Sequence, residues 1–86
     1  MNMGIVLHVV CADDGFDYVT NARNAVIRAI LRWVAEDVCT AFERYGRVPT
    51  RSVYRGTDVT LYVRLRNIER SGGRIYATYN VKPNYG

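Results

Sequence analysis

The sequence has little cysteine, histidine, proline or lysine, and no long apolar run. Its two cysteines form no CxxC pair and have no cluster of histidines to join, which argues against a zinc site. No apolar stretch reaches the ~20 residues that a membrane-spanning helix needs, and no basic segment typical of a signal peptide precedes the first apolar run. We therefore expect a cytoplasmic protein with reduced thiols at Cys11 and Cys39, no metal, no cofactor and no membrane partner.

Enough apolar sequence is present for one small folded domain. Of the 86 residues, 49% are hydrophobic and 23% are charged, a balance typical of globular proteins. We expect a single domain over residues 1–86, burying only about 60–65% of its unfolded surface. A core of this size would gain stability from a partner or from a homodimer.

The positive charge comes almost entirely from arginine. Formal net charge is +4, and Lys82 is the only lysine among the 12 cationic residues. The planar guanidinium group suits phosphate, carboxylate and stacked bases. An arginine-rich composition also arises from a GC-rich coding sequence, so this bias favours a polyanionic partner without requiring one.

Hydrophobic periodicity predicts one strand, one long helix and three more strands. The run Gly4–Ala12 is apolar on both faces, as in a strand inside a sheet. From about Tyr18 to Tyr45, apolar residues recur at helical spacing until a stop at Gly46. The later strands are expected at residues 51–55, 59–66 and 74–82, with a loop at 67–73. This gives an α+β fold of order β-α-β-β-β, with a mostly antiparallel sheet and the helix packed on one face.

Three acidic residues precede the predicted helix. Asp13, Asp14 and Asp17 are too few, and wrongly spaced, for an EF-hand calcium loop. An aspartate at a helix start can instead accept hydrogen bonds from the first free backbone N–H groups. We expect Asp14 or Asp17 to cap the helix.

The last hairpin carries the strongest functional signal. Its apolar residues alternate with polar ones, so one face should meet the helix and the other should stay open, with aromatic and basic side chains and no acid. Nucleic-acid-binding modules place aromatic side chains on a sheet for base stacking and cations around them for phosphates. Tyrosine and arginine are also ordinary on solvent-facing strands and enriched in protein interfaces. The candidate binding residues are Tyr62, Arg64, Arg66, Arg74, Tyr76 and Lys82.

The first strand would add apolar side chains to that open face. Val6, His8 and Val10 alternate with the residues expected to meet the helix. A wholly solvated face would not need these valines, so they favour a homodimer or a protein target. His8 has no apparent nucleophile or acid to work with, and we interpret it as a structural histidine.

Three helix residues do not fit a simple core pattern. Trp33 lies beside the apolar face and is expected in the core or in an interface. Arg23 and Asp37 fall inside the apolar arc, too far apart to pair with each other. Either each finds a partner on the sheet, another subunit or a target, or the helix rotates or ends so that both reach water.

The segment NARNAVIRA, residues 21–29, resembles the helix of dodecins, which are small flavin-storage proteins of strand–helix–strand–strand order. The likeness implies a small-ligand carrier. It covers about nine residues, and because the predicted helix is far longer and the flavin-stacking aromatic has no counterpart, no functional residue is carried over. In size and in lack of catalytic motifs, the chain also resembles the small inhibitors made by phages, including anti-CRISPR proteins.

No nucleophile, base and orienting group converge in the sequence, so we expect a non-enzymatic binding protein. The preferred target is nucleic acid or a nucleoprotein complex, held by the Tyr/Arg face of the sheet. The alternatives are a protein inhibitor or adaptor that does not bind nucleic acid, and a dodecin-like carrier.

Overall fold

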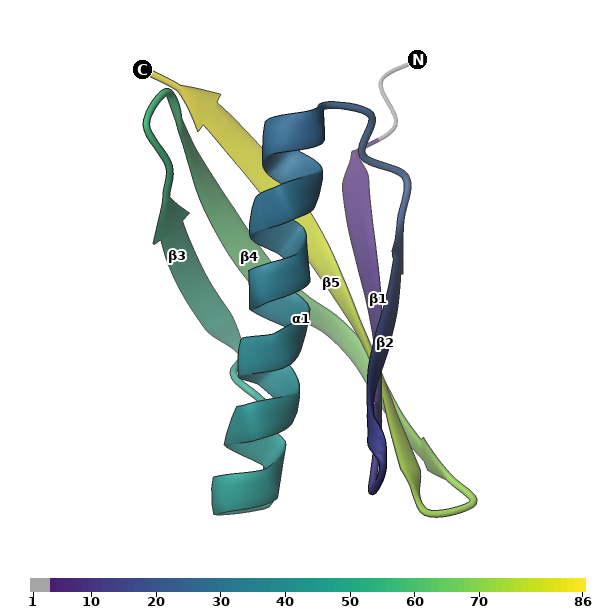
Figure 1. Ribbon diagram of the computed structural model, residues 1–86. Coiled ribbons are helices and arrows are strands. Elements are labelled where there is room, and N and C mark those ends of the chain that lie inside the picture. The colour runs from purple at the N-terminus through teal and green to yellow at the C-terminus, as the bar shows by residue number, and fades with distance from the viewer. Residues whose placement is uncertain (1–3) are drawn as a thin grey trace.

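The computed structural model describes residues 4–86 as one antiparallel five-stranded sheet with a single helix across one face (Figure 1). The strands lie in the order β2-β1-β5-β4-β3. The predicted α+β class is confirmed, and one further strand, β2, precedes the helix. The elements are β1 Ile5–Ala12, β2 Gly15–Thr20, α1 Ala25–Tyr45, β3 Arg51–Arg55, β4 Val59–Ser71 and β5 Arg74–Tyr85.

Strand β2 occupies the segment expected to begin the helix, so the predicted helix start at Tyr18 is wrong. Its half-buried residues, Phe16, Tyr18 and Thr20, alternate with exposed ones, which is the period of a strand. The prediction that Asp14 or Asp17 caps the helix is wrong for the same reason. Asp17 lies within β2, opposite Val10 of β1.

The helix is capped by Asn24 instead. The Asn24 Oδ1 atom accepts hydrogen bonds from the backbone nitrogens of Val26 at 2.9 Å and Ile27 at 3.1 Å. At the other end the chain leaves the helix through Gly46, whose φ of 72° lies in the left-handed region that glycine adopts without strain. The predicted stop is therefore confirmed.

We expect Asn24→Ala to lower the free energy of unfolding by about 1 kcal/mol, because two N–H groups of the first turn lose their acceptor. Urea unfolding measures this change. Asn24→Asp is the matched control, since aspartate accepts the same bonds and should keep most of the stability. An alanine variant as stable as the wild type would contradict this role for the cap.

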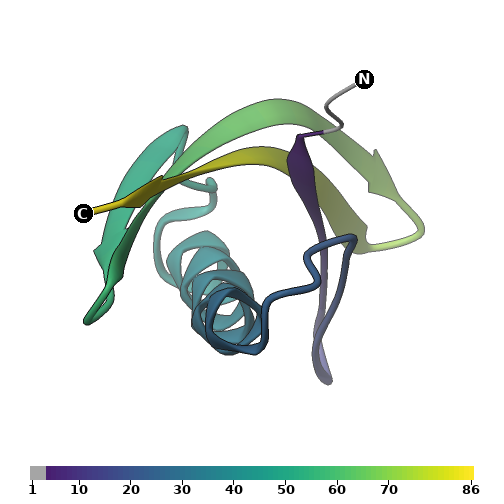
Figure 2. The ribbon, with the colours of Figure 1, turned by 90° about the horizontal axis from the view of Figure 1, so that it is seen from above.

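The core lies between α1 and the inner face of the sheet. The helix contributes Ile27, Leu31, Val34, Ala35 and Val38, all buried. Seen along the helix, the strands form an arch that bends around α1 (Figure 2). The side of the sheet that faces the helix is therefore concave, and the open face is convex.

The β4–β5 hairpin is much longer than its sequence pattern indicated. Pairing continues to Ser71 and Arg74, so residues 67–71 of the expected loop are strand, and only Gly72 and Gly73 form the predicted turn. A register shift between Leu65 and Asn67 inserts one extra residue, which interrupts the alternation on which the prediction relied. Strand β5 also continues past its predicted end to Tyr85.

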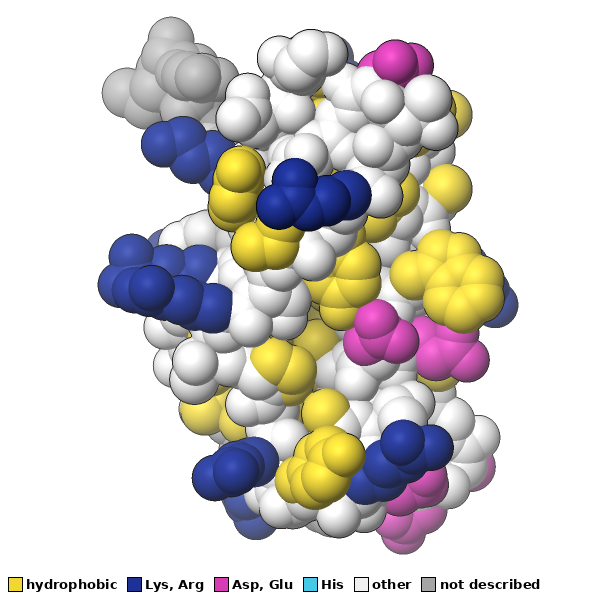
Figure 3. All heavy atoms as spheres, turned by 90° about the vertical axis from the view of Figure 1, so that its left-hand side faces the viewer, with side chains coloured by type: hydrophobic (Ala, Val, Ile, Leu, Met, Phe, Trp, Pro, Cys, Tyr) yellow, Lys and Arg dark blue, Asp and Glu magenta, His cyan; other side chains and the backbone are white. Residues whose placement is uncertain are grey.

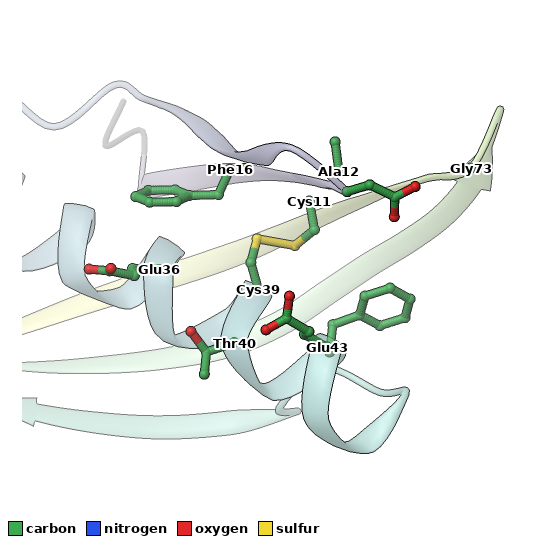
Figure 4. Close-up of a pocket in the computed structure, with 11 residues that line it drawn as sticks. Cys11, Ala12, Phe16, Glu36, Cys39, Thr40, Glu43 and Gly73 are labelled. Carbon is green, nitrogen blue, oxygen red and sulfur yellow. A yellow bond between two sulfur atoms is a disulfide. The ribbon is translucent and has the colours of Figure 1, made fainter.

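A disulfide joins Cys11 of β1 to Cys39 of α1 (Figure 4). The Cα–Cα distance is 5.3 Å, within the range that a disulfide spans. The expectation of two reduced thiols is therefore wrong. The helix crosses β1 where Cys11 points inward, a contact that positions 28 residues apart in the sequence do not reveal.

Candidate nucleic-acid interface

The open face carries a compact group of cations around one exposed tyrosine. Tyr62 of β4, 44% exposed, lies in register with Val53 of β3 on one side and Lys82 of β5 on the other. Arg64 follows two residues along β4, on the same face and about 7 Å away. We call this group the basic–aromatic patch: Arg51, Val53, Arg55, Tyr62, Arg64 and Lys82.

Like charges lie opposite one another in this patch. Arg64 of β4 is in register with Arg51 of β3 and, on its other side, with Asn80 of β5, so neither directly opposite neighbour is an acid. Like charges in such positions destabilise a strand pair, and a bound anion would relieve the repulsion. In a view from the β3 side, several Lys and Arg side chains gather on the left, while the Asp and Glu side chains in view lie to the right (Figure 3).

The structure brings together only part of the predicted binding set. Tyr62, Arg64 and Lys82 are neighbours, and exposed Arg66 lies at the β4 irregularity next to them. Arg74 and Tyr76 lie near the hairpin turn. Tyr76 is six residues from Lys82 along β5, which corresponds to about 20 Å.

The open face is not free of acids, contrary to the sequence prediction. Glu69 of β4 lies opposite Tyr76 because the hairpin extends beyond its expected end. Asp17 of β2 lies in the same row, across Val10. The surroundings of Tyr76 are therefore mixed in charge, unlike those of Tyr62.

Two cations of the basic–aromatic patch were not among the predicted binding residues. Arg51 and Arg55 are exposed, whereas Ser52 and Tyr54 between them are half-buried. This alternation is visible in the segment RSVYR. The alternation alone did not place Arg51 and Arg55 beside Tyr62, because nothing in the sequence says which face of β3 adjoins that residue.

The other half of the open face is more apolar. His8 of β1 lies in register with Val19 of β2 and Thr78 of β5, and its Nδ1 atom is 3.1 Å from the Thr78 hydroxyl oxygen. The predicted interface residues Val6 and Val10 flank His8 on the same face and are half-buried. We call the apolar patch the set Val6, His8, Val10, Val19, Tyr76 and Thr78.

The remaining helix candidates lie on the opposite side of the molecule. Trp33 is 62% exposed, so it is not a core residue. Asp37 has a partner on the sheet: the Tyr54 hydroxyl donates to Asp37 Oδ2 at 2.9 Å. Arg23 precedes the helix and is exposed to water. Asp37 therefore has a partner on the sheet and Arg23 reaches water, which are the two alternatives that the sequence left open.

A hollow of about 350 Å³ lies beside the disulfide, between α1, the β1–β2 turn and the β4–β5 turn (Figure 4). Two glutamates of the helix, Glu36 and Glu43, line it together with Phe16 and Phe42. Both cysteines that line it are bonded to each other, so it offers no free thiol. Within residues 4–86, no group of three or more His, Cys, Asp or Glu side chains could hold a metal ion.

In the part of the chain that the structure describes, no helix is long and apolar enough to cross a membrane. Comparisons with protein-family models, curated proteins and solved structures found no match to this chain. The residues resembling a dodecin helix lie half outside α1, since Asn24 is its cap.

Proposed function

We propose that this protein binds single-stranded nucleic acid, without catalysis, through the basic–aromatic patch. The observation that carries the proposal is the exposed ring of Tyr62, with Lys82 opposite it and Arg64 and Arg51 in the next row. A base stacks on the ring, and phosphates on either side meet the cations. Base–aromatic stacking contributes roughly 1–3 kcal/mol per base in such sites.

Geometry favours a single strand over a duplex. A base must be unpaired and splayed out to stack on a side chain, and sheet-based RNA modules read such bases. The basic–aromatic patch lies on the convex face of the sheet, away from the β4–β5 turn, so it does not itself form a helix or two-stranded ribbon that could enter a groove (Figure 2). We expect a short site with strong dependence on salt and little preference for sequence.

Tyr62→Ala combined with Arg51→Ala is expected to weaken binding of a labelled oligonucleotide ten- to hundredfold. The tyrosine change removes the stack, and the arginine change removes one phosphate contact. The slope of log K against log salt should become shallower by about 0.7 for a single strand. Fluorescence anisotropy with single- and double-stranded DNA and RNA, at low and moderate salt, measures both quantities.

The matched control is Tyr45→Ala combined with Arg74→Ala. It removes the same two residue types, also from exposed positions, but outside the patch. Circular dichroism should show both variants folded. Equal weakening in test and control would mean that only net charge matters, and wild type that binds nothing at low salt would overturn the proposal.

A second candidate function is binding of a protein target, as an inhibitor or adaptor. Exposed Trp33 favours it, because tryptophan dominates binding energy in many interfaces and here lies outside the core. Such binding should depend less on salt than nucleic-acid binding does. A pull-down that loses its captured protein with Trp33→Ala, but not with Tyr62→Ala, would distinguish this function from the first.

A further inference from the structure

We propose that the apolar patch is the interface between two copies of this chain, stacked with their open faces together. The two-fold axis lies midway between the two sheets. It runs across the strands, along the row of register neighbours Val19, His8, Thr78 and Asn67. These four residues are consecutive in register across β2, β1, β5 and β4. Rotation about this axis brings each strand antiparallel over the same strand of the second copy.

The apolar contacts match under this rotation. Val6 and Val10 lie two residues to either side of His8 on β1, so Val10 of each copy faces Val6 of the other. Val19, on the axis row, is 65% exposed in the single chain. Covering these valines removes apolar surface from water, which is favourable at roughly 25 cal/mol per Å².

The charges of the two copies are also complementary under this rotation. This complementarity identifies a second copy of the chain as the partner. On β4, Arg64 and Arg66 lie on one side of Asn67 and Glu69 lies on the other. The rotation places Glu69 of each copy over the basic segment of the other, so the contact is made twice. Such isologous complementarity is what a two-fold interface requires.

The remaining pairs within two residues of the axis row also bring no like charges together. On β5, Tyr76 and Asn80 lie two residues to either side of Thr78, so they face each other across the interface. On the β2 side, Asp17 faces the Asn21 position. Arg64 belongs both to this contact and to the basic–aromatic patch, whereas Tyr62 lies one row further from the axis on β4 and Arg51 lies on β3, outside the four strands that the axis row crosses.

Sedimentation equilibrium over a range of concentrations tests the interface. The wild type should give twice the chain mass, and Val19→Glu should raise the dimer dissociation constant at least about tenfold, because it places two carboxylates near the axis. Val53→Glu is the matched control: it is also an exposed valine of the open face, at 51%, but lies on β3 outside the interface. It should leave the mass unchanged.

A charge exchange tests the orientation. Glu69→Arg alone, or Arg64→Glu with Arg66→Glu alone, should each weaken the dimer by about tenfold, and the triple variant should recover it. A wild type that stays monomeric up to about 1 mM would overturn the proposal. So would equal dissociation by Val19→Glu and Val53→Glu, or a triple variant weaker than both parents.

Discussion

Removing the disulfide is expected to lower the free energy of unfolding by about 3–4 kcal/mol. Cys11 and Cys39 are separated by 28 residues, and closing a loop of that length restricts the unfolded chain by this amount in the chain-entropy account. The variant Cys11→Ala/Cys39→Ala removes the link without leaving a free thiol. Stability of a domain this small is of the order of 5–10 kcal/mol, so the loss is a large part of the total.

The place of the disulfide in the fold explains why its loss should matter. Cys11 is 4% exposed and lies on β1, which pairs with β2 and β5 near the middle of the sheet. Cys39 lies in the second half of α1, so the bond fixes that part of the helix against the sheet. Loosening it would expose the core beneath the helix.

Urea unfolding of three samples measures the effect: wild type, wild type with a reducing agent, and the double alanine variant. The last two should coincide, and the reducing agent should leave the alanine variant unchanged. A wild type that does not respond to reduction, and unfolds like the alanine variant, would show that the two cysteines are not linked.

The disulfide also changes what can be said about location. The cytoplasmic expectation depended partly on two reduced thiols, and disulfides persist mainly in oxidising compartments. A protein found reduced in its native compartment would have the lower stability of the alanine variant. Trapping of free thiols in freshly lysed cells, before oxidation, measures which form is present.

The sequence predicted the parts of the fold whose patterns are local. Helix α1 has a sustained apolar stripe and a glycine stop at Gly46, and β3 and the first half of β4 alternate cleanly. Strand β2 was missed because its alternation covers only six residues and runs into the helical stripe. As an edge strand, β2 is held by its pairing with β1, and a local sequence pattern does not reveal this pairing.

The candidate site was predicted in part, for a related reason. Tyr62, Arg64 and Lys82 were predicted to be neighbours, and they are, because Tyr62 and Arg64 precede the irregularity near Arg66, in the part of β4 where the alternation is unbroken. Beyond it, one inserted residue moved Glu69 onto the open face beside Tyr76. Register across a bulge is decided by tertiary packing, so no count along the sequence finds it.

Stability is expected to fall steeply above about pH 10, because two tyrosines are held neutral in the folded protein. Burial raises the pKa of the Tyr79 hydroxyl well above its ordinary value, and that hydroxyl donates to the Pro49 carbonyl at 2.8 Å. Burial, together with the hydrogen bond to Asp37, raises the pKa of Tyr54 in the same way. Both groups join the β3 region to the rest of the core.

The sign follows from which state loses the proton first. In the unfolded chain a tyrosine ionises near pH 10, whereas the folded state keeps the proton to higher pH. The stabilisation is therefore fully present below about pH 10 and is lost as the pH rises toward the folded-state pKa values. The slope is about 1.4 kcal/mol per pH unit for each tyrosine.

Urea unfolding at several values between about pH 9 and pH 11.5 measures this slope, with Tyr79→Phe and Tyr54→Phe as the variants. Each phenylalanine removes one ionisable group while keeping the ring, so each single variant should show about half the slope of the wild type. Each variant also loses a hydrogen bond, at roughly 1 kcal/mol, which lowers stability equally at every pH in this range. A wild type whose stability is flat up to pH 11.5, or variants that keep its slope, would mean that these hydroxyl groups reach water in the folded protein.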